Sequence, residues 1–128
     1  MAKSNIAATD ILRHLFLNIT PPWLDILEIS LHYDMPGNVQ SDSELTYDGY
    51  SRVKIPRNSD NWIVVGMEAV NKKDISFPIC KNGSQTAVYV GIGSNNELIH
   101  VAELDDPIAI NKRIQPIIKS QSLKIIET

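Results

Sequence analysis

The stretch TAVYVGIGSNNELIHVAEL, Thr86 to Leu104, decides the fold of this chain. From Val88 to Ile92 every second residue is apolar, which is the period of a half-buried strand. Ser94 to Asn96 then predict a turn, because Asn tolerates a left-handed backbone and bonds its own main chain. The following run, 97–104, is apolar on both faces near its middle, as in a central strand between two layers. We therefore expect this hairpin at the centre of a sheet.

Outward from the hairpin, the chain carries short apolar runs separated by turn residues. We expect a hairpin turn at Lys81-Asn82-Gly83, a turn at Asp105-Asp106-Pro107, and a bulge or bend at Gly66. Short strands at this spacing indicate a mainly β chain, an antiparallel β-sandwich or jelly-roll-like barrel with one N-terminal α-helix. The expected strands cover 23–33, for which a helix is the alternative, and 50–55, 62–65, 67–70, 75–79, 108–110, 114–118 and 122–127.

One segment predicts a helix, Ser4 to Asn18. Ser4 can cap its start, and the pair Pro21-Pro22 prevents its continuation. Its apolar residues recur at spacings of one, three and four, so they form one stripe. Such a stripe must pack either on a sheet of its own chain or on a neighbouring molecule. The stripe consists of Ile6, Ala7, Ile11, Leu12, Leu15 and Phe16.

The most polar stretch, DMPGNVQSDSELTYDG at 34–49, is expected to be an exposed loop. Its carboxylates Asp42, Glu44 and Asp48 favour contact with water. Loops of about 15 residues without secondary structure are uncommon and tend to be functional or mobile. We therefore expect this loop to contact a partner.

Length and composition fit one globular domain over residues 1–128, with 43% apolar and 21% charged residues. A net charge of −3 argues against nucleic-acid binding, because nucleic-acid-binding domains are usually basic. The single cysteine, Cys80, excludes an internal disulfide, and it lies in an apolar run where a buried, inert thiol is expected. No run approaches the ~20 apolar residues of a membrane span, and the N-terminus does not resemble a signal peptide. We expect synthesis and folding in a cytoplasm.

No catalytic signature stands out in the sequence. The pair Gly91 and Gly93 follows a strand, but a dinucleotide fingerprint needs a third glycine and a following helix. His32, Asp34 and His100 are a conceivable metal site, although their spacing matches no known metal motif. We therefore expect no enzyme, no cofactor and no metal.

The two tryptophans are the largest candidate anchors. Core packing is the expected role of Trp23 and Trp62, and an interface contact is the alternative, because Trp is enriched at binding hot spots. Trp62 with Tyr47 and Tyr50 could also form a stacking surface for a carbohydrate.

Several motifs follow one another along the chain. A helix runs through a Pro-Pro step into a strand in AATDILRHLFLNITPPWLDILEISLHYDMP, and an acidic loop ends in a strand in ELTYDGYSRVKI. After Trp62 come VNKKDISFPIC, the central hairpin and DDPIAINKRIQPIIKSQSLKIIE. The most specific pieces are Gly-Tyr-Ser-Arg-Val at 49–53 and Ile-Ser-Phe-Pro at 75–78. This order resembles a family of small bacteriophage proteins, often labelled tail-fibre-like or minor virion structural proteins, over nearly the whole chain.

The resemblance implies a β-sandwich virion protein without enzymatic activity, assembled in many copies on a phage particle. One compact domain without repeats or a coiled coil cannot form a long fibre, which favours a capsid decoration or cement protein. Its partners would be the major capsid protein or other virion proteins, and it would form a homo-oligomer. The alternatives are a tail or tail-fibre component and, in another class, a carbohydrate-binding host-recognition module. The expected partner contacts are Ile11, Leu12, Leu15, Phe16, Asp42, Glu44, Tyr47 and Trp62.

Overall fold

The predicted central hairpin is present as β7 (Gln85–Ser94) and β8 (Glu97–Ile110), which pair antiparallel. The structure is a computed structural model that describes residues 2–3, 5–21 and 26–126. Asn95 and Asn96 form the turn with positive φ angles of 51° and 63°. A two-residue hairpin loop of this type requires a left-handed backbone at both positions, which Asn accepts readily.

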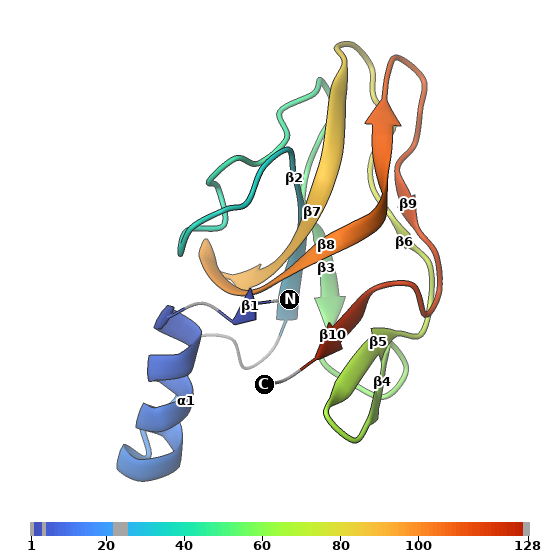
Figure 1. Ribbon diagram of the computed structural model, residues 1–128. Helices are drawn as coiled ribbons and strands as arrows, with labels where there is room; N and C mark the ends of the chain where they lie inside the picture. The colour runs from blue at the N-terminus through green and yellow to red at the C-terminus, as the bar shows by residue number, and fades with distance from the viewer. Residues whose placement is uncertain (1, 4, 22–25, 127–128) are drawn as a thin grey trace.

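The largest sheet is built around this hairpin (Figure 1). Its strand order is β1-β8-β7-β2-β3, with β1 (Ala2–Lys3), β2 (Ile26–His32) and β3 (Val53–Pro56). Every neighbouring pair is antiparallel. β7 therefore lies in the middle of the sheet, between β8 and β2.

Two smaller antiparallel sheets complete the β structure. One has the order β10-β5-β4, with β4 (Trp62–Val65), β5 (Glu68–Asn71) and β10 (Lys124–Ile126). The other pairs β6 (Ile75–Ser76) with β9 (Ile117–Ile118). In Figure 1 both lie towards the right of the view, whereas α1 lies at the lower left.

One hydrophobic cluster joins the three sheets. Phe77 is fully buried at its centre, and its ring stacks on that of Tyr50 with the centroids 6.4 Å apart. The predicted mainly β, antiparallel sandwich with one helix near the N-terminus is confirmed. Other fully buried members of the cluster are Ile29, Leu31, Ala87, Val90, Cys80 and Ile110.

Two turn predictions are wrong. Lys81-Asn82-Gly83 does not close a hairpin, because β6 pairs with β9 while Asp48 bridges to Asn82. The sequence Asp105-Asp106-Pro107 lies inside β8 rather than in a turn. The short β1 pairs with β8 only at residues 100–101, so residues 105–107 of β8 are not paired with β1. Proline is tolerated there because an edge of a strand does not need every backbone N–H. Gly66 does form a bend, with a φ of +61°, in the β4–β5 hairpin.

The segment 34–49 is not the fully exposed loop that its polarity predicts. Asp42 is exposed, but Gln40, Leu45 and Tyr47 are buried. The segment is held to the main sheet by backbone bridges, one between Val39 and Glu97. The prediction fails because the few apolar residues of this stretch pack into the core while its carboxylates face outward or form ion pairs.

The predicted N-terminal helix is observed as α1 (Asn5–Leu17). Asn18, with a φ of 56°, follows it in the left-handed conformation that ends many helices. Ala7 is fully buried against the body of the protein, whereas the C-terminal half of α1 projects away from the sheets (Figure 1). Ser4 and Trp23, the predicted helix cap and the second aromatic anchor, lie outside the described residues.

Candidate functional site

An open apolar groove lies between α1 and the β4–β5 hairpin. It has a volume of about 650 Å³. Ile11 of α1 forms one wall, Val64 and Met67 of the hairpin form the other, and the floor comes from the main sheet and β10. Side chains on its floor and rim include Leu27, Trp62, Ile92, Ile99 and Ile125, together with Arg57, Glu68 and His100.

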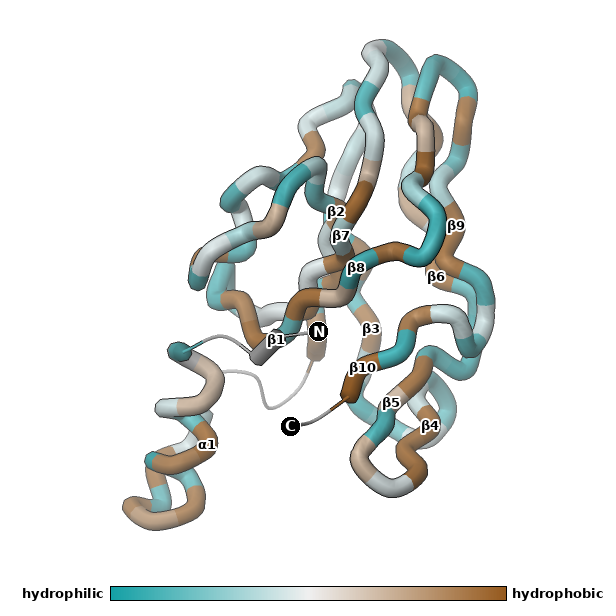
Figure 2. Tube along the Cα trace, viewed as in Figure 1, coloured by the Kyte–Doolittle hydropathy of each residue, from teal (hydrophilic) through white to brown (hydrophobic). Residues whose placement is uncertain are grey.

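Exposed hydrophobic side chains lie on both of the elements that flank the groove. Leu12, Leu15 and Phe16 of α1, here called the helix ridge, are 55%, 69% and 74% exposed. Val64, Val65 and Met67, the hairpin ridge, are 69%, 74% and 70% exposed. Figure 2 shows hydrophobic residues both on α1 and on the β4–β5 hairpin.

The apolar surface formed by these ridges is at the upper end of what a single domain usually exposes. At roughly 100 Å² for each large exposed side chain, the two ridges present roughly 600 Å², before the groove lining is added. The largest apolar patch of a typical soluble monomer covers roughly 300–600 Å², and larger ones mark interaction sites. The groove and its ridges are therefore the candidate functional site.

The structure brings together some of the predicted contact residues and separates others. Ile11 and Trp62, distant in sequence, line the same groove, and the exposed helix ridge lies on the same helix as Ile11. Asp42 is exposed on a different segment. Glu44 is held in an ion pair, and Tyr47 is only 4% exposed with its hydroxyl donating to the Pro78 carbonyl at 2.6 Å.

The burial of Tyr47 also removes the predicted carbohydrate surface. A stacking platform needs exposed ring faces, but the Tyr47 ring packs edge-on against Tyr50 inside the core cluster. Burial raises the pKa of the Tyr47 hydroxyl to about 12. Trp62 therefore lines the groove without the two tyrosines.

The hairpin ridge is not among the contact residues predicted from the sequence. Val64, Val65 and Met67 flank Gly66, where the sequence predicts two strands separated by a bulge or bend. A signal was present, because turn residues are usually polar whereas this turn is surrounded by large apolar side chains.

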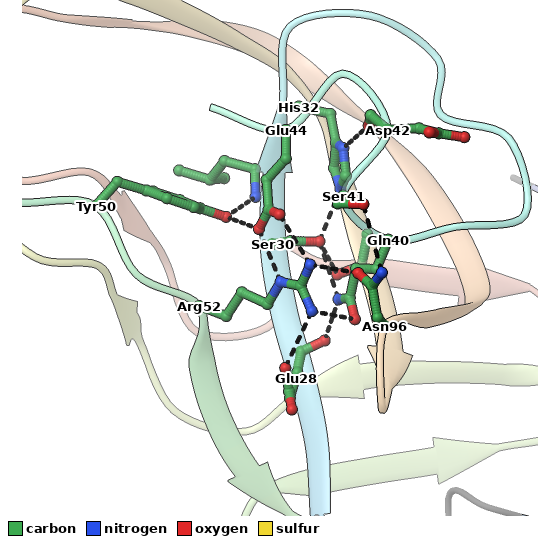
Figure 3. Close-up of polar contacts among 12 residues, drawn as sticks. Glu28, Ser30, His32, Gln40, Ser41, Asp42, Glu44, Tyr50, Arg52 and Asn96 are labelled. Atoms are coloured by element: carbon green, nitrogen blue, oxygen red, sulfur yellow. Dashed lines mark hydrogen bonds and ion pairs between the residues drawn. The ribbon is translucent and has the colours of Figure 1, made fainter. Parts of the chain in front are cut away.

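A polar cluster centred on Arg52 fastens the segment 34–49 to the main sheet (Figure 3). Arg52 donates from Nε and Nη2 to the two carboxylate oxygens of Glu44, both at 2.9 Å. It also contacts Glu28 at 3.3 Å and the side-chain oxygen of Asn96 at 2.7 Å. Glu44 in turn accepts from the Tyr50 hydroxyl at 2.6 Å. The hydrogen bond to Glu44 raises the pKa of Arg52, so the cluster fixes its charged form.

His32 belongs to the same cluster and is saturated by its neighbours. Nδ1 lies 2.8 Å from the Asp42 carbonyl, which can only accept, so Nδ1 carries the proton and donates. Nε2 then accepts from the Ser30 hydroxyl at 2.7 Å. Burial lowers the pKa of His32, which favours this neutral ring. Both ring nitrogens are therefore occupied, which argues against the metal site considered from the sequence.

Replacing Arg52 with methionine is expected to destabilise the fold by about 2 kcal/mol. The substitution would leave the carboxylates of Glu44 and Glu28 without their shared cation in a partly desolvated place. The expected loss of stability is smaller than for a fully buried ion pair because the Arg52 side chain is 20% exposed. Urea unfolding would measure it, with the exposed Lys112→Met as a control that should change stability little. Equal stability of the two variants would contradict this role of Arg52.

A pair of carboxyl groups lies between the middle of α1 and the main sheet. Burial and a hydrogen bond with Asp10 of α1 raise the pKa of Glu97, at the start of β8, to about 7. A hydrogen bond between two carboxyl groups requires one proton, so the pair attracts only while one of them is protonated. Arg13 lines the same small cavity.

The attachment of α1 to β8 is expected to weaken as the pH rises through about 7. With α1 attached, Glu97 binds a proton more tightly than its ordinary pKa of 4.5 allows, so attachment is strongest below pH 4.5 and weakens as the pH rises from 4.5 to about 7. Hydrogen exchange of the α1 amides relative to those of β7 would measure this at pH 5.5 and 8. Glu97→Gln should flatten the dependence, and protection that increases with pH would contradict it.

Comparison with known families identifies the kind of protein. A family model described as "Podophage GP4 fiber I protein gp80" matches residues 2–125. The chain belongs to this family. It is a phage virion structural protein, so the family resemblance and the virion location predicted from the sequence are confirmed. Family membership also implies association with other virion proteins. No curated protein matches the chain.

The described residues lack both a membrane-spanning helix and a metal-binding cluster. They contain no helix long and apolar enough to cross a membrane. Residues 2–3, 5–21 and 26–126 also contain no group of three or more His, Cys, Asp or Glu side chains placed to hold a metal ion.

Proposed function

We propose that the protein is a non-enzymatic assembly subunit of the fibre apparatus of a podophage virion, attached to its neighbours through the groove between α1 and the β4–β5 hairpin. The observation that carries the proposal is the exposed pair of apolar ridges beside an open groove. Covering such a surface removes apolar area from water, which is the main driving force of protein association.

The family description favours a fibre component over the capsid decoration protein expected from the sequence. The chain carries no repeat and no coiled-coil heptads, which shafts of fibres commonly need. A compact β domain with one apolar docking face suits an attachment module, which joins other virion components, better than it suits the shaft.

The role of a capsid decoration or cement protein is a second candidate. The same compactness supports it, because a small domain can bridge neighbouring copies of the major capsid protein. Binding only to the assembled shell would stabilise that shell by mass action. Both candidates use the same docking face and differ in the partner.

Two side chains that could act in catalysis, His32 and Cys80, are engaged in the fold, which supports a structural role. The ring of His32 is held at both nitrogens. The thiol of Cys80 is fully buried and lies 3.3 Å from the Asn82 carbonyl oxygen, to which it donates. A buried thiol bonded to the backbone is a poor nucleophile.

Locating the protein on purified virions by cryo-electron microscopy tests the proposal. Density at the fibre attachment region, with the groove facing a neighbouring subunit, is the expected result. Density bridging coat subunits on the shell would establish decoration instead. Absence of the protein from the particle, or a groove open to solvent in the particle, would overturn the docking function.

A further inference from the structure

We infer that α1 of a second copy of this chain occupies the groove, so that the protein self-associates by exchanging helices between copies. This inference rests on the proposed docking function and names the partner. A single patch of the surface supplies both a helix with an unpartnered apolar face and a groove of complementary chemistry.

The helix ridge has the spacing that grooves recognise. Leu12, Leu15 and Phe16 are three and four residues apart, so they project from one side of α1 as neighbouring anchors. Amphipathic helices bind apolar grooves through anchors at this spacing. Ala7, in the first half of α1, is fully buried and holds the helix on its own chain, whereas the ridge residues further along the helix are exposed and free to enter a neighbour.

The groove has a size and lining suited to such a ridge. Its volume of about 650 Å³ is within the roughly 300–1,000 Å³ of sites that enclose apolar ligands. Val64 and Met67 form the wall opposite Ile11, and Trp62 lines the groove with them. Trp is a frequent anchor of protein interfaces.

The position of the ridge beside the groove makes the patch self-complementary. If two copies meet about a two-fold axis, each inserts its helix ridge into the groove of the other, and the same contact forms twice. The ridges alone offer roughly 600 Å² per copy, and the other groove residues add to this, which approaches the roughly 800 Å² per partner of a standard interface. The area is therefore of the order that a dimer needs without another partner.

The test measures the oligomeric state of the full chain by analytical ultracentrifugation over a range of concentrations. The wild type is expected to dimerise. Leu15→Asp, which damages the ridge, and Met67→Asp, which damages the groove, are each expected to abolish the dimer. Both positions are exposed, so each variant should fold, as circular dichroism and thermal unfolding would show. Ile79→Asp is the matched control, because Ile79 is exposed and apolar but does not line the groove.

Mixing the two defective variants distinguishes helix exchange from other dimers. The Met67→Asp chain retains an intact ridge and the Leu15→Asp chain an intact groove, so their mixture is expected to form heterodimers through one intact contact. A mixture that stays monomeric overturns the inference. A dimeric Met67→Asp, which a helix-to-helix contact would give, or a dimeric Leu15→Asp, which a hairpin-to-hairpin contact would give, overturns it as well. A monomeric wild type at every concentration also overturns it.

Failure of this inference is distinguishable from failure of the docking function. If the wild type is monomeric but Leu15→Asp is lost from virions, the groove docks a different virion protein and only the self-association is wrong. If Leu15→Asp is retained in virions at the normal level, the docking function fails as well.

Discussion

Binding of the Leu15→Asp, Phe16→Asp double variant to the virion is expected to be weaker than that of the wild type by a factor of about one hundred or more. Burial of a Leu or Phe side chain contributes about 1.5–3 kcal/mol, and each 1.4 kcal/mol changes an equilibrium constant about tenfold. The two side chains are 69% and 74% exposed on the helix ridge, so nearly all of this contribution is available to a partner. Quantitative immunoblotting of purified virions would measure the retained protein.

The double variant needs a control that places a carboxylate at an exposed apolar position elsewhere on the surface. Ile79→Asp also replaces an exposed apolar residue by a carboxylate, and we expect normal incorporation for it. Both variants should unfold at the wild-type temperature to within a few degrees, because none of the three substituted positions is in the core. Normal incorporation of the double variant would contradict a docking role for the helix ridge.

Replacing Gly93 with alanine is expected to destabilise the fold by about 3 kcal/mol, which is the upper end of the usual effect of overpacking. An added Cβ would overlap the carbonyl oxygen of Glu97 and the side-chain oxygen of Gln40. The Glu97 carbonyl belongs to the backbone of the central hairpin and cannot rotate away. Gln40 is fully buried, and its amide donates to the Glu28 carbonyl at 2.7 Å.

Urea unfolding of Gly93→Ala beside Gly66→Ala separates steric overlap from the conformational cost of losing a glycine. Gly66 has a φ of +61° but open space around its Cβ position, so its substitution should cost only about 1 kcal/mol. A Gly93→Ala variant no less stable than Gly66→Ala would contradict the close packing of Gln40 on the hairpin.

The central hairpin and α1 were predictable because local patterns determine them. An alternating run, two asparagines and a second apolar run fix β7, the turn and β8 almost regardless of the remaining chain. The glycines of β7 illustrate the limit of such patterns. The sequence excluded a dinucleotide fingerprint at Gly91 and Gly93 but gave no other reason for them. The structure supplies one, because side chains of β2 and of Gln40 occupy the space that a Cβ would need at these positions.

Long-range pairing could not be predicted from the sequence. The polarity of 34–49 indicated an exposed loop, yet Arg52 draws Glu44 and Asn96 together across 8 and 44 residues. No local signal specifies which cation a carboxylate will meet. The strand pairing of β6 with β9 is equally distant in sequence, so a local turn at Asn82-Gly83 was a misleading guide.

The candidate site was predictable in part. The stripe of α1 identified the helix ridge, and Trp62 was a candidate anchor, but their meeting in one groove depends on tertiary structure. The hairpin ridge was not predicted, and its residues lie at the facing ends of the expected strands 62–65 and 67–70. Asp42, Glu44 and Tyr47 were chosen because their loop was expected to be free, and that expectation was wrong for Glu44 and Tyr47.

The most direct test of the docking groove is the oxidation of methionine in the free protein and in the intact virion. Met67 on the hairpin ridge is 70% exposed, and Met35, in the segment 34–49, is 52% exposed and serves as an internal reference. Peptide mass spectrometry after mild peroxide treatment would compare the two sites. We predict that both residues oxidise in the free protein at concentrations where it is monomeric and that only Met67 becomes protected in the virion. Equal oxidation of Met67 in the free protein and in the virion would contradict the account.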